Sequence, residues 1–214
     1  MRSSPDWPSG ARWIVLALAR IEGRRLLRHP FILAAAALTV SAVLVLLTSD
    51  DPDAGYEWSL LIPFMLFDGA VLVAVNLAAL RGRRDHADEL YASLPAPARA
   101  RTSAHLLSLA WAVAAAAALV ALAVLAFMIR GNSLPSIASA VSTPALVALC
   151  GALGLALARW LPHPAVAAAG VVGAFALANG GPLAASRGLV VAGFVGLTVL
   201  CGVAALLPDR RRLG

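Results

Sequence analysis

The sequence predicts an all-α membrane protein with six transmembrane helices, preceded by a cytoplasmic interfacial helix, with the N- and C-termini both cytoplasmic. Three observations support this fold class: the apolar composition, six apolar runs of spanning length, and the distribution of arginine among the connections. Hydrophobic residues make up 61% of the chain and charged residues 13%, and the mean hydropathy is +0.85. Soluble domains are about 45–50% apolar and about 25% charged. A soluble fold of this size would leave too much apolar surface in water, so lipid is the expected solvent.

The six apolar runs cover approximately residues 31–48, 59–80, 103–129, 137–160, 164–185 and 188–207. A helix needs about 20 mostly apolar residues to cross a bilayer. Long runs of Ala and Leu favour helix, and the short alternating segments of a membrane β-barrel are missing. Asn179-Gly180-Gly181-Pro182 interrupts the fifth run, so a five-helix bundle is the alternative.

Arginine distribution predicts the topology. The chain contains no lysine, and 15 of its 17 arginines fall in the N-terminal segment, the second and fourth connections and the C-terminal tail. The other three connections contain only Arg130 and Arg187. Because cytoplasmic loops carry an excess of basic residues, we expect a cytoplasmic N-terminal segment (1–30), a transmembrane domain (31–207) with a cytoplasmic connection (81–102), and a cytoplasmic basic tail (208–214). Topology therefore explains the net charge of +6 without a nucleic-acid partner.

The N-terminal segment is expected to form a helix over approximately residues 9–29, lying along the inner leaflet. Arg20, Arg24 and Arg28 recur every four residues and share a stripe, to which Arg25 adds a further charge. Trp13 and other apolar residues suit the headgroup region. Pro30 would turn the chain into the membrane. The alternative interpretation is a charged topology anchor.

The connection 81–102 mixes both charge signs, whereas a topology anchor needs arginine alone. We expect a short amphipathic helix that docks on a soluble partner, with a solvated loop as the alternative. The candidate docking residues are Arg83, Arg84, Asp85, His86, Asp88, Glu89 and Tyr91.

Three polar residues inside the apolar runs are candidates for a translocation path: Asp68, Asn76 and Asn179. A carboxylate at mid-depth costs about 2.5–3.5 kcal/mol on insertion scales, so it usually faces the bundle interior or a wet cavity. Three interpretations of Asp68 stay open. It lines a substrate path, it forms a structural hydrogen bond with Thr39 or Asn179, or it carries a proton.

No pattern in the sequence predicts an enzyme. Without lysine there is no P-loop or Schiff-base lysine, and the four histidines lack the spacing of metal ligands. We therefore expect no catalytic residue, metal or cofactor on this chain. Pairs of glycines, among them Gly151 and Gly154, are interpreted as helix-packing positions.

Two stretches resemble the permease subunits of ABC-2 type exporters: RRLLRHPF at 24–31, and ELYASLP at 89–95 followed by Arg99, Arg101 and Thr102. The resemblance implies an interfacial helix, six membrane helices and a coupling helix between the second and third. It also implies a separate ABC ATPase subunit that binds ATP and Mg, a second permease copy or homologous permease, and a place in the inner (plasma) membrane. The alternatives are a non-transporting structural or regulatory membrane protein, and a membrane enzyme or ion-coupled transporter that uses Asp68.

Overall fold

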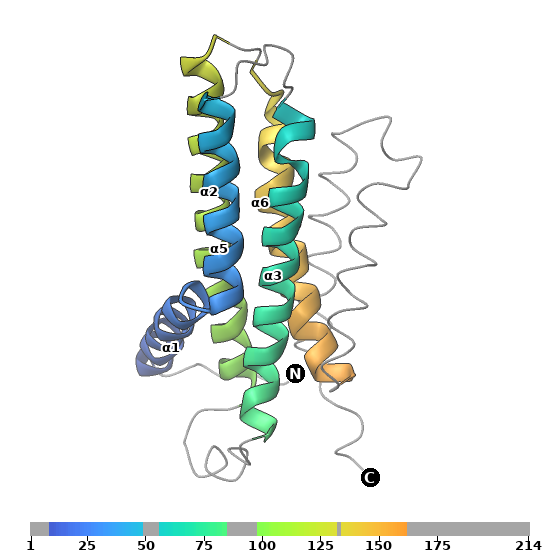
Figure 1. Cartoon of the computed structure of the whole chain (residues 1–214). Coiled ribbons are helices and arrows are strands. Elements are labelled where there is room, and N and C mark those ends of the chain that lie inside the picture. Colours follow the sequence, from blue (N-terminus) through green and yellow to red (C-terminus); the bar gives the residue numbers. More distant parts are fainter. Residues whose placement is uncertain (1–8, 49–55, 85–97, 132–133, 162–214) are drawn as a thin grey trace.

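A computed structural model describes residues 9–48, 56–84, 98–131 and 134–161, and all the regular structure in these stretches is helical. The helices are α1 (Ser9–Leu27), α2 (Pro30–Thr48), α3 (Tyr56–Arg84), α5 (Ala98–Ile129) and α6 (Ile137–Trp160) (Figure 1). Within these residues, four segments are long and apolar enough to cross a membrane: Pro30–Thr48, Ile62–Arg81, Thr102–Ile129 and Ile137–Trp160. They match the first four predicted spans. The fifth and sixth, 164–185 and 188–207, lie outside the described residues, as does the basic tail.

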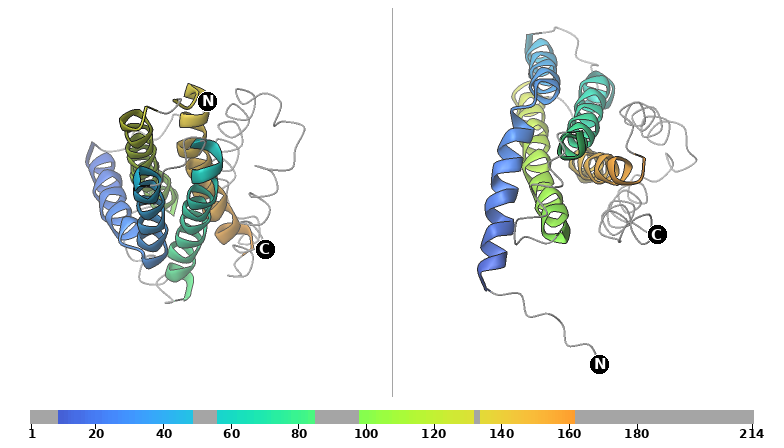
Figure 2. Two further views of the ribbon diagram at one scale, coloured as in Figure 1. Left: turned by 45° about the horizontal axis from the view of Figure 1, so that its top comes forward. Right: turned by 90° about the horizontal axis from the view of Figure 1, so that it is seen from below.

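The four apolar helices run side by side and alternate in direction along the chain, while α1 lies at an angle across one end of the bundle (Figures 1 and 2). α1 packs mainly against α5, α3 packs against α6 and α2, and α5 also contacts α6. The same end of the bundle therefore gathers α1, the start of α2, the end of α3, the start of α5 and the end of α6 (Figure 1).

Two of the helices extend beyond the predicted spans. α3 has 29 residues and α5 has 32, so the predicted connection 81–102 shortens to residues 85–97. The prediction used hydropathy, which marks where lipid ends, whereas helical hydrogen bonding continues through arginine, a good helix former. Both helices therefore project from the apolar layer at the end of the bundle where α1 lies.

Local sequence signals explain the helix boundaries. Pro30 is the first residue of α2, a position where its missing N–H costs nothing. The His29 carbonyl accepts hydrogen bonds from the N–H groups of Ile32 and Leu33, both at 3.0 Å. α6 begins after Ser136, whose hydroxyl accepts a hydrogen bond from the Ser139 N–H at 3.1 Å. Gly131, which has a φ of 71°, follows the end of α5, and its N–H donates to the Met128 carbonyl.

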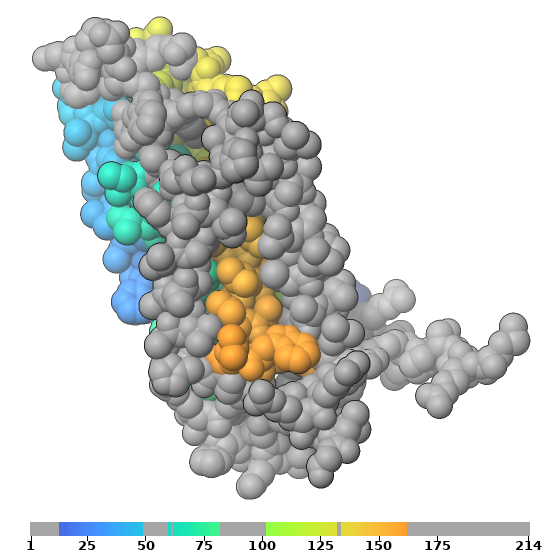
Figure 3. Space-filling view, turned by 90° about the vertical axis from the view of Figure 1, so that its right-hand side faces the viewer, coloured from blue at the N-terminus to red at the C-terminus, as the bar shows by residue number. Residues whose placement is uncertain are grey.

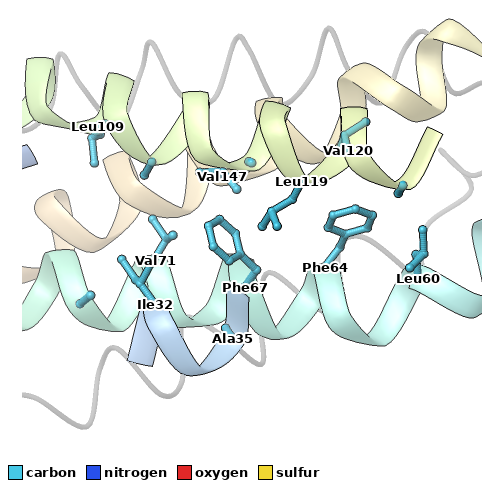
Figure 4. Packing of buried hydrophobic residues seen from close by; sticks show 14 of the residues in the cluster. Ile32, Ala35, Leu60, Phe64, Phe67, Val71, Leu109, Leu119, Val120 and Val147 are labelled. Atoms are coloured by element: carbon cyan, nitrogen blue, oxygen red, sulfur yellow. The ribbon is translucent and has the colours of Figure 1, made fainter. Parts of the chain in front are cut away.

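The core of the bundle is a continuous apolar cluster between α2, α3, α5 and α6. Phe64, Phe67 and Val71 of α3 lie at its centre, among Ile32, Leu119 and Val147 from the other helices (Figure 4). The outward sides of the same helices expose large apolar side chains such as Leu33, Val45 and Leu125. Figure 3 views the side on which part of α6 reaches the surface. An apolar exterior around an apolar core is the arrangement that a lipid environment requires.

Candidate functional site

The arginines of α1 lie on its exposed surface. Arg20, Arg24 and Arg25 are exposed within the helix, and Arg28 is exposed directly after its last turn. Arg24 and Arg25 lie near the helix C-terminus, where the helix dipole favours positive charge. Arg25 forms an ion pair with Glu22 at 3.3 Å, but this arginine side chain is 70% exposed, so the pair contributes little to stability. The predicted arginine stripe is therefore exposed on the helix surface, and its place at a membrane interface stays a prediction.

The buried face of α1 is formed by small and aliphatic residues: Ala19, Gly23 and Leu26. The indole of Trp111 in α5 lies directly over Gly23, and a Cβ atom on residue 23 would overlap the ring. Glycine at this position is therefore what allows α1 to lie close against the first half of α5 (Figure 2). The packing fixes which side of α1 faces outward.

The outward surface of α1 changes character along the helix. Its first half exposes Trp13, Ile14 and Leu16, and Ile21 extends this surface into the arginine-bearing half. Trp13 and Ile14 are thus exposed, and the predicted place of Trp13 in the headgroup region stays a prediction. Large exposed apolar side chains beside arginines are typical of a helix that lies in a membrane interface.

His29 lies at the junction between α1 and α2, with its ring centroid 5.3 Å from that of Phe31. Burial lowers the pKa of His29, and the positive charge of Arg81 at the far end of α3 lowers it further. The imidazole Nδ1 atom is buried without a hydrogen-bond partner. Burial and positive charge at this junction both disfavour the protonated form of His29, so the neutral form is favoured.

Other arginines gather at the same end of the bundle. Arg81, Arg83 and Arg84 belong to the last turns of α3, and Arg99 and Arg101 belong to the first turn of α5. Arg159, in the last turn of α6, donates a hydrogen bond to the Thr102 hydroxyl at 3.4 Å.

Among the described residues, one arginine lies at the opposite end: Arg130, whose guanidinium donates to the Leu46 carbonyl near the end of α2. For the described arginines, the two groups distinguished in the sequence thus lie at opposite ends of the bundle (Figure 1).

Asn76 joins α3 to α6 inside the bundle. Its side-chain amide donates a hydrogen bond to the Gly154 carbonyl at 3.1 Å, and the residue is fully buried. The two helices approach so closely here that a Cβ on Gly154 would lie 2.6 Å from the Leu72 carbonyl oxygen. The Asn76 side-chain oxygen is buried without a partner. Asn76 therefore holds two helices together at their closest approach.

Asp68 lies two turns before Asn76 on α3 and is 5% exposed. Its Oδ1 atom has no hydrogen-bond partner. Thr39, one of the two partners considered for Asp68, instead has its hydroxyl 2.9 Å from the Ala35 carbonyl and 3.3 Å from that of Pro63, and the other, Asn179, lies outside the described residues. A threonine inside a helix commonly bonds the carbonyl four residues back, and here that bond directs the Thr39 hydroxyl along α2 and toward Pro63 of α3.

The remaining candidate residues lie outside the described part of the chain. Asp85, His86, Asp88, Glu89 and Tyr91 fall in 85–97, and Asn179 falls in 162–214. The predicted amphipathic docking helix therefore stays a prediction. In the described residues, no three His, Cys, Asp or Glu side chains lie close enough to bind a metal ion.

Sequence reasoning missed three close contacts: Gly23 with Trp111, Asn76 with Gly154, and Thr39 with Pro63. Its interpretation of Gly151 and Gly154 as packing positions is confirmed, because a Cβ on Gly151 would lie 2.6 Å from a Leu109 methyl group of α5. Gly23 was detectable as a glycine in the interior of an arginine-rich helix, where glycine is costly unless something packs against it.

Neither family models nor curated proteins nor solved structures show a match to this sequence.

Proposed function

We propose that this chain is the transmembrane permease subunit of an ATP-driven exporter of the ABC-2 type. In this proposal the chain has six spans and cytoplasmic termini, resides in the inner membrane, and forms the translocation path with a second permease copy. A separate ATPase subunit binds ATP and Mg. Asp68, Asn76 and Asn179 are the candidate path residues.

The main observation behind the proposal is that α1 packs against the first half of α5. α1 lies at the arginine-rich end, where α3 ends at Arg84 and α5 begins at Ala98. A soluble partner that binds the connection between α3 and α5 would displace α5, and α5 would move α1 with it because α1 packs mainly against α5. This supports a helix pair suited to transmit motion from a partner to the bundle.

The two ends of α5 would have different roles in this proposal, one toward the partner and one toward α2. Its N-terminal end projects beyond the apolar layer and carries Arg99 and Arg101. Its C-terminal end is tied to α2 by the hydrogen bond from Arg130 to the Leu46 carbonyl. A displacement at the first end would therefore reach α2 at the second, because helices transmit motion as rigid elements. ATP would shift the equilibrium between two conformations, because it would bind the ATPase subunit more tightly in one conformation than in the other.

The proposal is tested by purifying the tagged chain from its native membranes and assaying the eluate for ATPase activity. A bound ATPase subunit is expected, together with vanadate-sensitive ATP hydrolysis that depends on the permease. Reversing the connection charges with Asp88→Arg and Glu89→Arg should uncouple hydrolysis from export, because the docking surface would lose its acidic half.

The matched control is Asp50→Asn with Asp51→Asn, which alters two acids in the connection predicted to lie on the opposite side. The control should leave ATPase stimulation and export unchanged. If the chain is purified without any ATPase, the non-transporting structural role is favoured. If the charge-reversed protein still couples ATP hydrolysis to export, the docking assignment is wrong.

A further inference from the structure

The exposed surface of α1 combines large apolar side chains with arginines, and large apolar side chains are unfavourable in contact with water. Trp13 is 75% exposed, and Ile14, Leu16 and Ile21 are each about half exposed, at 50%, 53% and 49%. Arg20, Arg24 and Arg28 are exposed on the same helix and its final turn. A helix in free solution would bury such apolar residues or lack them, so this surface needs a partner with an apolar layer and a charged layer.

Charge complementarity determines which partner fits. Glu22 is the one acidic residue in the sequence of α1, and it faces Arg25 at 3.3 Å. Arg81, exposed at the end of α3, adds positive charge at the α1–α2 junction, where it lowers the pKa of His29. The junction and the arginine half of α1 therefore present positive charge in excess.

The position of α1 continues the lipid-facing surface of the bundle. Phe31, in the first turn of α2, is 50% exposed, and Leu33 and Trp111 are exposed nearby along α2 and α5. The arginine-bearing half of α1 leads directly into α2, and Trp111 lies over Gly23 in that same half, so this half of the helix adjoins the exposed apolar side chains. An acidic soluble protein would match the arginines but leave the apolar residues in water, and a neutral lipid surface would leave the arginines without counter-charge.

From this arrangement we infer that α1 binds anionic phospholipid headgroups of the leaflet at the arginine-rich end. Arg20, Arg24 and Arg28 contact the headgroup phosphates while Trp13, Ile14 and Leu16 enter the acyl boundary. The inference is independent of the transport proposal, since it holds for a permease and for a non-transporting protein alike.

The test measures lipid selectivity of the full-length chain in neutral detergent. Phosphatidylglycerol and phosphatidylcholine are titrated separately, and bound lipid is counted by native mass spectrometry. Each basic residue near an anionic surface strengthens binding by about 5-fold. The protein should therefore bind phosphatidylglycerol far more tightly than phosphatidylcholine, and salt of about 1 M should remove the difference because the Debye length falls to about 3 Å.

The decisive variant carries Arg20→Gln, Arg24→Gln and Arg28→Gln, with the corresponding triple lysine variant as the charge-retaining control. The glutamine variant should lose about 100-fold in phosphatidylglycerol affinity and keep its phosphatidylcholine affinity. The lysine variant should retain the preference. Far-UV circular dichroism and gel filtration verify that both variants fold.

Equal binding of the two lipids by the unaltered chain would overturn the inference, and this measurement needs no variant. Undiminished phosphatidylglycerol binding by a folded glutamine variant would overturn it as well. Loss of a co-purifying protein from that variant, with lipid binding unchanged, would assign the surface to protein docking instead.

Discussion

Two helix contacts in this molecule are both made possible by glycine, yet they differ in what lies opposite. In the α3–α6 contact, Gly154 faces the backbone carbonyl of Leu72, and the Asn76 amide bonds to the Gly154 carbonyl. In the α1–α5 contact, Gly23 faces the indole of Trp111, which is itself 39% exposed. A backbone atom cannot move aside without moving its helix, whereas a half-exposed side chain can rotate.

The difference teaches which parts of the bundle are fixed and which can shift. α6 is held against α3 on a buried face with a polar bond across it, so their relative position has little freedom. α1 is held by one face while its other face is exposed to lipid or solvent. If the protein changes shape during its working cycle, α1 is the helix whose contact can adjust at the lower cost.

The largest effect is expected from Gly154→Ala. The new Cβ would lie 2.6 Å from the Leu72 carbonyl oxygen, so α3 and α6 must separate. The expected loss is about 1–3 kcal/mol of unfolding free energy, measured by titration with a denaturing detergent. Gly151→Ala is the matched comparison, because the group opposite it is a movable Leu109 methyl. Equal losses at the two positions would show that the α3–α6 contact is not the tighter one.

A smaller effect is expected from Asn76→Leu, which removes the hydrogen bond to Gly154 while keeping the number and branching of the non-hydrogen side-chain atoms. Interhelical hydrogen bonds in membrane proteins contribute about 0.6 kcal/mol on average and at most about 1.7. The same titration gives the free-energy change. A double variant with Gly154→Ala should lose less than the sum of the two single changes, because both act on one contact. Strict additivity would contradict the claim that they form a unit.

Gly23→Ala should cost less than Gly154→Ala, toward the lower end of the range of about 1–3 kcal/mol that is typical of overpacking, because the group in the way is the Trp111 side chain and not a backbone carbonyl. The displaced indole should change its fluorescence maximum, and Trp111→Phe removes that signal as a control. A loss as large as that of Gly154→Ala would mean that α1 is as firmly fixed as α6.

The smallest effect on stability is expected from His29, which lies between the end of α1 and the start of α2. Its pKa lies below the ordinary value of 6.5, so the folded protein binds this proton less readily than the unfolded chain. The stability that the folded protein gains by keeping His29 neutral is fully present above pH 6.5, and it is lost as the pH falls through the lowered pKa. His29→Gln should flatten that part of the stability profile. A profile that is unchanged by the substitution would remove His29 from this account.

Sequence alone was sufficient for features set by local pattern. Hydropathy located four helices, and the bounds predicted for residues 137–160 coincide with α6. The four-residue spacing of Arg20, Arg24 and Arg28 identified an exposed stripe, because periodicity fixes which residues share a face. Pro30 marked the start of α2 for a comparable reason: its ring fixes φ and its missing N–H is harmless there.

What the sequence could not supply is the identity of each partner across a contact. Asn76 and Gly154 are 78 positions apart, and nothing in either neighbourhood names the other. The cost of a carboxylate in lipid predicts that Asp68 faces inward, but the sequence does not show that the Thr39 hydroxyl is directed to carbonyls of Ala35 and Pro63. Hydropathy likewise could not locate the ends of α3 and α5, since these helices continue through arginine outside the apolar layer.

Cysteine accessibility in intact cells tests the central claim most directly, namely that the arginine-rich end of the bundle lies in the cytoplasm. Single cysteines at exposed positions of the two ends, Leu134→Cys on one side and Arg24→Cys or Leu161→Cys on the other, are introduced after replacing Cys150 and Cys201 with alanine. A membrane-impermeant maleimide should label position 134 in intact cells, and positions 24 and 161 only after permeabilisation. Labelling of all three positions from the same side, or the reverse pattern, would contradict the account.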